Sequence, residues 1–176
     1  MSEVLNLADA EKSIAVTMSK LAMLLGVWRG EGSGGFPTIE SFDYTEETSF
    51  HSNGREPLVH FEQKTWVKSA TETNGDPLHW ESGFIRVIED GSVEMSNAQN
   101  GGRVEVLKGQ IDQQASLNGG FLLALESVLF GNDPRLVQTR RTYELRDGKL
   151  SYFVEMATGR TPELQRHLQA VLEKVT

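Results

Sequence analysis

The sequence predicts an all-β protein, an antiparallel up-and-down β-barrel of about ten strands with a short N-terminal helix. Six Asx-Gly dipeptides divide the chain, and Gly adopts the positive φ that a tight hairpin turn needs, while Asn and Asp tolerate it. The segments between them are rich in β-branched and aromatic residues, as strands are. A long meander exposes two outer edges, and closure into a barrel hides both. The dipeptides are Asn53-Gly54, Asn74-Gly75, Asp90-Gly91, Asn100-Gly101, Asn118-Gly119 and Asp147-Gly148.

Residues 5–25 carry the pattern of an amphipathic helix, with apolar residues at spacings of three, four and seven and Gly26 as a helix stop. These apolar residues are Leu7, Ile14, Met18, Leu21 and Leu25. We expect residues 1–20 to form a helical extension and residues 21–176 to form the barrel domain. The helix should pack on the outside of the barrel or close one end. An exposed helix of this kind can also pair with a second copy, so a homodimer is compatible with the sequence.

Strand patterns follow from Val27 onward. We expect two strands flanking a flexible link at residues 33–37, then a series of strands, and finally a hairpin that turns at residues 146–149. The expected strands are 27–32, 38–50, 57–68, 78–89, 92–99, 102–111 and 120–130, with the hairpin over 136–158.

The last segment, residues 161–176, fits two structures. An apolar stripe at helical spacing, with Thr161 as N-cap and Pro162 at the first helical position, favours a helix. Read with period two, Leu168, Ala170 and Leu172 share one face of a strand. Local propensity favours the helix, whereas a barrel that needs one more strand to close favours the strand.

Composition excludes several classes of function. With 17 basic and 25 acidic residues the formal net charge is −8, which disfavours a nucleic-acid partner. The chain has no cysteine, so disulfides, thiolate nucleophiles and Cys-ligated metals are excluded. No run approaches the roughly 20 apolar residues that span a bilayer, and the first residues do not resemble a signal peptide. We therefore expect a cytoplasmic protein that does not enter a membrane.

The catalytic motifs that we sought in the sequence are missing. No G-x-S-x-G, Walker loop or dinucleotide-binding glycine motif occurs, and Glu46 and Glu47 are expected to be solvated on a strand. The four histidines are His51, His60, His79 and His167. The first two flank a turn and are expected to be solvated, and His79 at a strand start is expected to be a hydrogen-bonded residue of the barrel rim. His167 among leucines is ordinarily structural, yet a neutral imidazole also coordinates iron, and a small barrel can hold one ligand.

The segment 26–32 is rich in glycine. In an extended chain Gly26, Gly30 and Gly32 share one face with Trp28. A face without side chains allows close approach of another strand or of a flat ligand. The simpler interpretation is a kinked first strand whose Trp28 plugs the bottom of the barrel.

Several blocks, in order, resemble the nitrobindins over roughly residues 21–175. They begin with the G-x-W-x-G-x-G signature in Leu25-Gly26-Val27-Trp28-Arg29-Gly30-Glu31-Gly32 and continue through Phe36–Phe42, Gln63–Trp66, Leu78–Gly83, Val104–Gly109, Asp147–Tyr152 and His167–Leu172. The resemblance implies a fatty-acid-binding-protein-like barrel that binds haem b, binds nitric oxide and isomerises peroxynitrite to nitrate.

The resemblance also implies roles for particular residues. His167 is the axial iron ligand, which makes the last segment a strand, and Arg140 pairs with a haem propionate. Arg141 is its neighbour, and only one of the two can point inward. Thr38 contacts the haem pocket, and His79 lies over the opposite face of the haem, where substrate binds. The loop 157–163 is about one residue longer than in the family, which affects the tilt of His167.

Two other functions are compatible with the same fold. One is a haem-free carrier of a small apolar ligand, as in lipocalins, and the other is an interaction module whose interior is filled by side chains.

Overall fold

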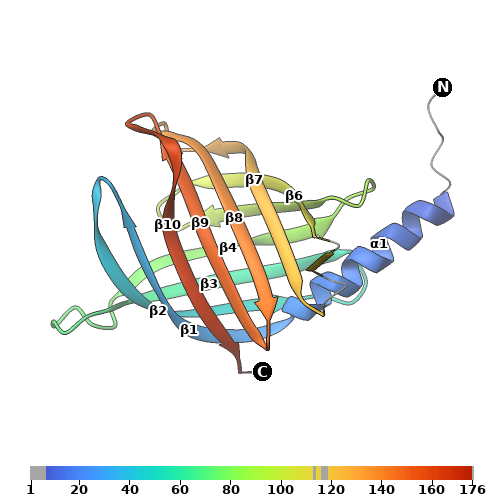
Figure 1. The fold of residues 1–176 in the computed structure, drawn as a ribbon, viewed down its shortest axis with the longest axis horizontal. Helices are drawn as coiled ribbons and strands as arrows, with labels where there is room; N and C mark the ends of the chain where they lie inside the picture. Colours follow the sequence, from blue (N-terminus) through green and yellow to red (C-terminus); the bar gives the residue numbers. More distant parts are fainter. Residues whose placement is uncertain (1–6, 113, 116–118, 176) are drawn as a thin grey trace.

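The computed structural model describes residues 7–112, 114–115 and 119–175. It is a closed barrel of ten antiparallel strands, confirming the predicted fold class (Figure 1). Each strand pairs with the next along the chain, and the first pairs with the last, so no edge is left open. The strands are β1 Gly26–Phe36, β2 Ile39–His51, β3 Leu58–Lys68, β4 Pro77–Val87, β5 Val93–Gln99, β6 Val104–Ile111, β7 Phe121–Gly131, β8 Leu136–Arg146, β9 Lys149–Thr158 and β10 Thr161–Lys174.

The Asx-Gly dipeptides lie in connections between strands, as expected. Asp147 and Gly148 both have positive φ, 51° and 76°, and join β8 to β9 directly, as a type I′ turn requires. In the turn after Asn100, however, the positive φ of 88° falls on Gly102 rather than on Gly101. Asn118 lies outside the described residues.

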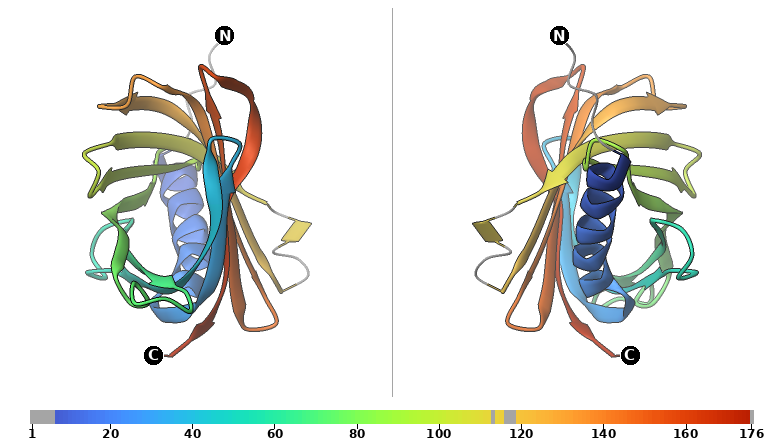
Figure 2. Two further views of the ribbon diagram at one scale, coloured as in Figure 1. Left: turned by 90° about the vertical axis from the view of Figure 1, so that its left-hand side faces the viewer. Right: turned by 90° about the vertical axis from the view of Figure 1, so that its right-hand side faces the viewer.

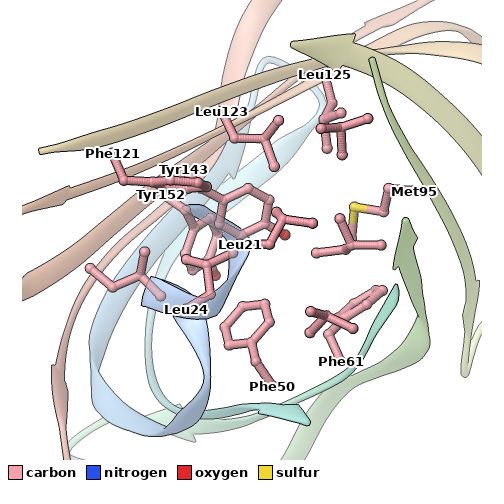
Figure 3. Close-up of a cluster of buried hydrophobic side chains, with 14 of the residues drawn as sticks. Leu21, Leu24, Phe50, Phe61, Met95, Phe121, Leu123, Leu125, Tyr143 and Tyr152 are labelled. Carbon is pink, nitrogen blue, oxygen red and sulfur yellow. The ribbon is translucent and has the colours of Figure 1, made fainter. Parts of the chain in front are cut away.

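The helix α1 spans Leu7–Leu21 and is followed by a 3₁₀ turn, η1, at Ala22–Leu24. It stands at one end of the barrel, in front in the right-hand panel of Figure 2. Leu21 and Leu24 are fully buried and point into the barrel among aromatic side chains such as Phe50 and Phe61 (Figure 3). The helix therefore closes one end of the barrel, and residues 5–6 of the expected helix lie outside the described residues.

The first strand differs from the expectation of a short strand and a flexible link. β1 continues to Phe36, because its glycines let side chains of β2 lie across it. A Cβ added at Gly32 would lie 2.3 Å from the Tyr44 ring, and one at Gly34 would lie 2.3 Å from the Phe42 ring. Trp28 is buried and its Nε1 donates to the Leu24 carbonyl at 2.6 Å, so it plugs the closed end as the simpler interpretation predicted.

The last segment is a strand, not the helix that local propensity favours. β10 pairs with β1 from Gly34↔Leu168 to Trp28↔Lys174 and with β9 on its other side. Two ladders of backbone hydrogen bonds outweigh the helix preference of the segment. Among the described residues, no helix is long and apolar enough to cross a bilayer.

Candidate functional site

The end of the barrel opposite the helix contains two adjoining cavities. The inner cavity has a volume of about 260 Å³ and the outer cavity about 620 Å³, and His167, Ile39 and Arg103 line both. The inner cavity has an apolar wall and a polar floor, and the outer cavity lies under the turns between β7 and β8 and between β9 and β10. Together they form a site centred on His167, which we call the barrel mouth.

His167 lies on β10 at a β-bulge, where the pairing with β9 skips from Arg166↔Glu155 to Leu168↔Val154. A bulge turns a side chain away from the direction that strict alternation would give it. The His167 Nδ1 lies 3.1 Å from the Gly35 carbonyl oxygen on β1, and the Phe36 ring packs edge-on at 5.9 Å. Closure of the barrel therefore orients the imidazole.

This geometry determines which nitrogen of His167 is free. A carbonyl oxygen only accepts, so Nδ1 carries the hydrogen and Nε2 carries the lone pair. Nε2 has no hydrogen-bond partner among the residues that the structure describes. Burial lowers the pKa of His167, and the hydrogen bond to Gly35 opposes this only in part. The imidazole is thus neutral at pH 7, the form that binds a metal through Nε2.

His79 lies on β4 and also lines the inner cavity. Its Nε2 lies 3.5 Å from Glu81 Oε2, and its side chain is 27% exposed. His79 is thus a partly exposed residue of the mouth, and its ring faces a buried carboxylate.

The two adjacent arginines of β8 are oriented the other way round from the expectation that Arg140 faces the haem pocket. Arg140 lies on the outer face, where it pairs with Glu126 of β7, and it lines neither cavity of the barrel mouth. Arg141 points inward and is buried against Glu81 and Glu105, with Nη2 donating to Glu81 Oε2 at 2.8 Å. The alternation of side chains along the strand could have predicted this orientation, because Arg141 shares its face of β8 with Tyr143, a core residue.

Glu81 stays charged although it is completely buried. Burial raises the pKa of this carboxyl, but the charge and hydrogen bonds of Arg141 outweigh burial and hold the pKa below its usual range. The Nε of Arg141 and the Oδ1 of Asn97 are buried without a hydrogen-bond partner in the described part of the chain. The Glu81–Arg141 ion pair forms part of a charged floor beneath the mouth.

Thr38 and Arg103 are two of the polar residues that line the outer cavity. Thr38 is exposed in the turn between β1 and β2 and lines the outer cavity. Arg103 was missed, although it follows the Asn100-Gly101-Gly102 turn, and turns alternate between the two ends of a meander. Its Nε donates to Gln99 at 3.0 Å, and Nη1 lies 3.8 Å from Asp133. Arg103 and the exposed Arg160 make this entrance cationic.

Sequence reasoning also missed a buried polar cluster at the floor of the inner cavity. Glu46, expected to be solvated, is buried, while Glu47 points outward and pairs with Arg29. The Tyr152 hydroxyl lies 2.6 Å from Glu46 Oε2 and accepts from Gln63 Nε2 at 2.7 Å. Burial raises the pKa of Glu46 to about 7, against its hydrogen bonds from Thr48, Tyr152 and Gln63.

The residues of the mouth fit a haem group. Nε2 of a neutral histidine is the usual protein ligand of haem iron, and apolar side chains suit the porphyrin faces. Cationic side chains at the entrance suit its two carboxylates. The apolar residues of the two cavities include Phe36, Ile39, Phe42, Val154, Met156 and Leu168.

Comparisons with known proteins agree with this fit. Residues 17–174 match the family model described as "THAP4-like, heme-binding beta-barrel domain". The chain is 44% identical to a protein of Arabidopsis thaliana named peroxynitrite isomerase Rv2717c, covering 90% of this chain and 89% of the relative. It is 35% identical to peroxynitrite isomerase 2 of Mycobacterium avium, covering 89% and 94%. The crystal structure of Rv2717c from M. tuberculosis superposes with a TM-score of 0.80 at 32% identity, covering 91% of this chain and 98% of that one.

Proposed function

Because the chain belongs to the family of THAP4-like haem-binding β-barrel domains, we propose that it binds one haem b at the barrel mouth and isomerises peroxynitrite to nitrate. The curated relatives, named peroxynitrite isomerases, span nearly the whole chain and support this activity. They also confirm the resemblance to nitrobindins. The observation that carries the proposal is the neutral His167, whose Nε2 lies free at the mouth.

His167 would hold the iron as its single protein ligand. A haem held by His167 would supply the Lewis acidity that cleavage of the O–O bond of peroxynitrite needs. The Gly35 carbonyl keeps the imidazole in the required tautomer and raises its basicity. The chain contributes the ligand, its orientation and a mouth partly shielded from water.

Arg103 and Arg160 are the residues that we assign to the haem carboxylates, in place of Arg140. Both line the outer cavity, whereas Arg140 is engaged with Glu126 on the outside of the barrel. Thr38 lines the same cavity and is a further polar contact for this edge of the haem. Arg141 lines the inner cavity but is already neutralised by Glu81 and Glu105.

His79 is the residue that we assign to the substrate side. It lines the inner cavity on β4, a strand that is not adjacent to β10 in the barrel. Its ring can donate a hydrogen bond to an oxygen of the bound anion. Nitric oxide, a small neutral molecule, is proposed as a second ligand of the same site.

Self-association and cytoplasmic location are the remaining parts of the proposal. Val16 is 49% exposed on α1, which supports pairing of two copies through the helix. Sedimentation would test the pairing, and cell fractionation would test the location.

The composition of the mouth disfavours the two alternatives. An apolar carrier would need an apolar floor, but Glu46, Glu81 and Arg141 lie beneath the inner cavity. An interaction module with a filled interior would not leave cavities of about 260 and 620 Å³. The haem-dependent function accounts for both features.

The decisive test follows peroxynitrite with the purified protein. The hemin-loaded protein should accelerate peroxynitrite decay in proportion to its concentration, with nitrate as the main product. Apoprotein and an equal amount of free hemin are the controls. Decay no faster than with free hemin would contradict the proposed function.

A further inference from the structure

A chain of hydroxyl groups crosses the barrel floor from β2 to β10. It begins at the buried carboxyl of Glu46, whose Oε2 lies 2.6 Å from the Tyr152 hydroxyl of β9. The Tyr152 hydroxyl lies 2.9 Å from that of Tyr44, and the Tyr44 hydroxyl lies 3.1 Å from the Gln169 carbonyl of β10. Gln169 is two positions along β10 from His167. The chain thus links a buried acid to the strand that carries the candidate iron ligand.

Counting hydrogens shows which protonation state fits these contacts. Three oxygen–oxygen contacts each need one hydrogen, whereas Tyr152 and Tyr44 together supply two. If Glu46 is ionised, one of the three contacts has no hydrogen between its oxygens. If Glu46 is protonated, it donates to Tyr152, Tyr152 donates to Tyr44, and Tyr44 donates to the Gln169 carbonyl. The remaining neighbours agree with either state, because Thr48 and Gln63 donate hydrogens of their own.

The groups around Glu46 leave it as the member that changes charge near neutral pH. On β2 and β9, Tyr44 and Tyr152 have pKa values that burial raises above the ordinary tyrosine value. On β8, burial raises the pKa of Tyr143 to about 12, and Arg141 is paired. Glu81 of β4, whose charge raises the pKa of Glu46, stays ionised beside Arg141.

We propose that Glu46 is a positioning residue whose proton, through Tyr152 and Tyr44, controls the hydrogen bond to the Gln169 carbonyl and so the placement of His167. With the proton present, the relay is complete and β10 is tied to β2 through the Tyr44 side chain, which lies across β1 at Gly32. Without it, Tyr152 turns its hydrogen to the Glu46 carboxylate, and Tyr44 has one hydrogen for two acceptors. The second part, the effect on His167, rests on the proposed haem-binding function.

The relay can be tested without haem. Labelling with carbonyl-¹³C glutamine and ¹⁵N alanine selects Gln-Ala peptide bonds, of which the sequence has two, Gln114-Ala115 and Gln169-Ala170. In the apoprotein the Gln169 carbonyl shift should change between about pH 5.5 and 8.5, with a midpoint near the pKa of Glu46, about 7. The exposed Gln114 provides an internal control.

Three variants separate the relay from general effects of pH. Glu46→Gln keeps a donor toward Tyr152 that does not titrate, so the Gln169 signal should stay at its low-pH position throughout. Tyr44→Phe removes the last link and should give a signal that does not titrate either, at a different position. Glu47→Gln, a neighbour on the outer face, should titrate like the wild type.

Hemin affinity tests the consequence for His167. Relative to Glu46→Gln, wild-type affinity should fall about 2- to 10-fold as pH rises across the same range, the effect of one hydrogen bond. A Gln169 carbonyl that does not titrate, or that titrates equally in Glu46→Gln, would overturn the relay. A titrating carbonyl with a constant affinity ratio would overturn the positioning role. Failure of the wild type to bind hemin would contradict the proposed function instead, and the carbonyl titration would still decide the relay.

Discussion

The imidazole of His167 and the backbone carbonyl of Gly35 are hydrogen-bonded, with Nδ1 and O 3.1 Å apart, across the seam that closes the barrel. His167 belongs to the last strand and Gly35 to the first, and these strands pair from Gly34↔Leu168 onward. The candidate iron ligand is therefore oriented by the same contacts that complete the sheet. Disturbing the seam should disturb haem binding as well as stability.

Gly34→Ala tests this dependence. The added methyl group would lie 2.3 Å from the Phe42 ring and 2.8 Å from Leu168 Cδ2, so overpacking should cost about 1–3 kcal/mol in urea unfolding and weaken hemin binding. Gly101→Ala is the matched control, since a Cβ there meets nothing within 4 Å and Gly101 lines neither cavity. Equal stability and hemin affinity in the two variants would show that the seam does not constrain the site.

The neighbouring arginines of β8 should behave differently. Arg141→Ala leaves Glu81 and Glu105 buried without their partner and should cost about 3–5 kcal/mol. Arg140→Ala removes a surface ion pair and should cost about 1 kcal/mol or less, with no change in hemin affinity. Urea unfolding and hemin titration of both variants check the assignment. Loss of hemin affinity in Arg140→Ala alone would restore the orientation that the sequence suggested.

Glu46 should make the protein less stable as pH rises. Its pKa is about 7 in the fold against an ordinary value of 4.5, so between these values the folded state holds a proton that the unfolded state has released. The free energy of unfolding should therefore fall across this window, by at most about 3.5 kcal/mol. Glu46→Gln should lose this slope, measured as the difference between wild type and variant near both ends of the window. A difference independent of pH would mean that Glu46 is ionised throughout.

His79→Ala separates haem binding from the substrate side. Because His79 lies on β4, which is not adjacent to β10, its removal should leave the Soret spectrum and hemin affinity unchanged. Peroxynitrite decay should slow about 3- to 10-fold, the effect of losing one hydrogen bond to the anion. If peroxynitrite decays at the wild-type rate in the presence of His79→Ala, His79 is not a substrate-binding residue.

Much of this architecture could be predicted from local sequence. The Asx-Gly turns and the β-branched runs between them predict the order of the strands, because each depends on only a few neighbouring residues. The last segment could not be assigned in this way, since its ladder with β1 joins residues that are far apart in the sequence, such as Gly34 and Leu168. The strand was expected only from the need for closure and from the resemblance to nitrobindins.

Side-chain direction was harder to predict than strand position. The bulge between Leu136 and Gln138 lies just before Arg140, and one extra residue reverses which side chains point inward. Glu46 illustrates a different difficulty. Alternation with Glu47 implies that one of the two points inward, but a carboxyl is normally expected in water. Its burial depends on Tyr152, over 100 positions away in the chain, as part of a polar cluster that local pattern does not reveal.

The central claim, that His167 holds the haem iron, is tested most directly by hemin titration of the wild type and His167→Ala, followed at the Soret band. The wild type should bind one hemin with a sharpened Soret band, and His167→Ala should keep the circular dichroism of a folded barrel while losing that band. Added imidazole should restore the band by filling the vacated position. A wild-type Soret spectrum and affinity in His167→Ala without imidazole would contradict the assignment.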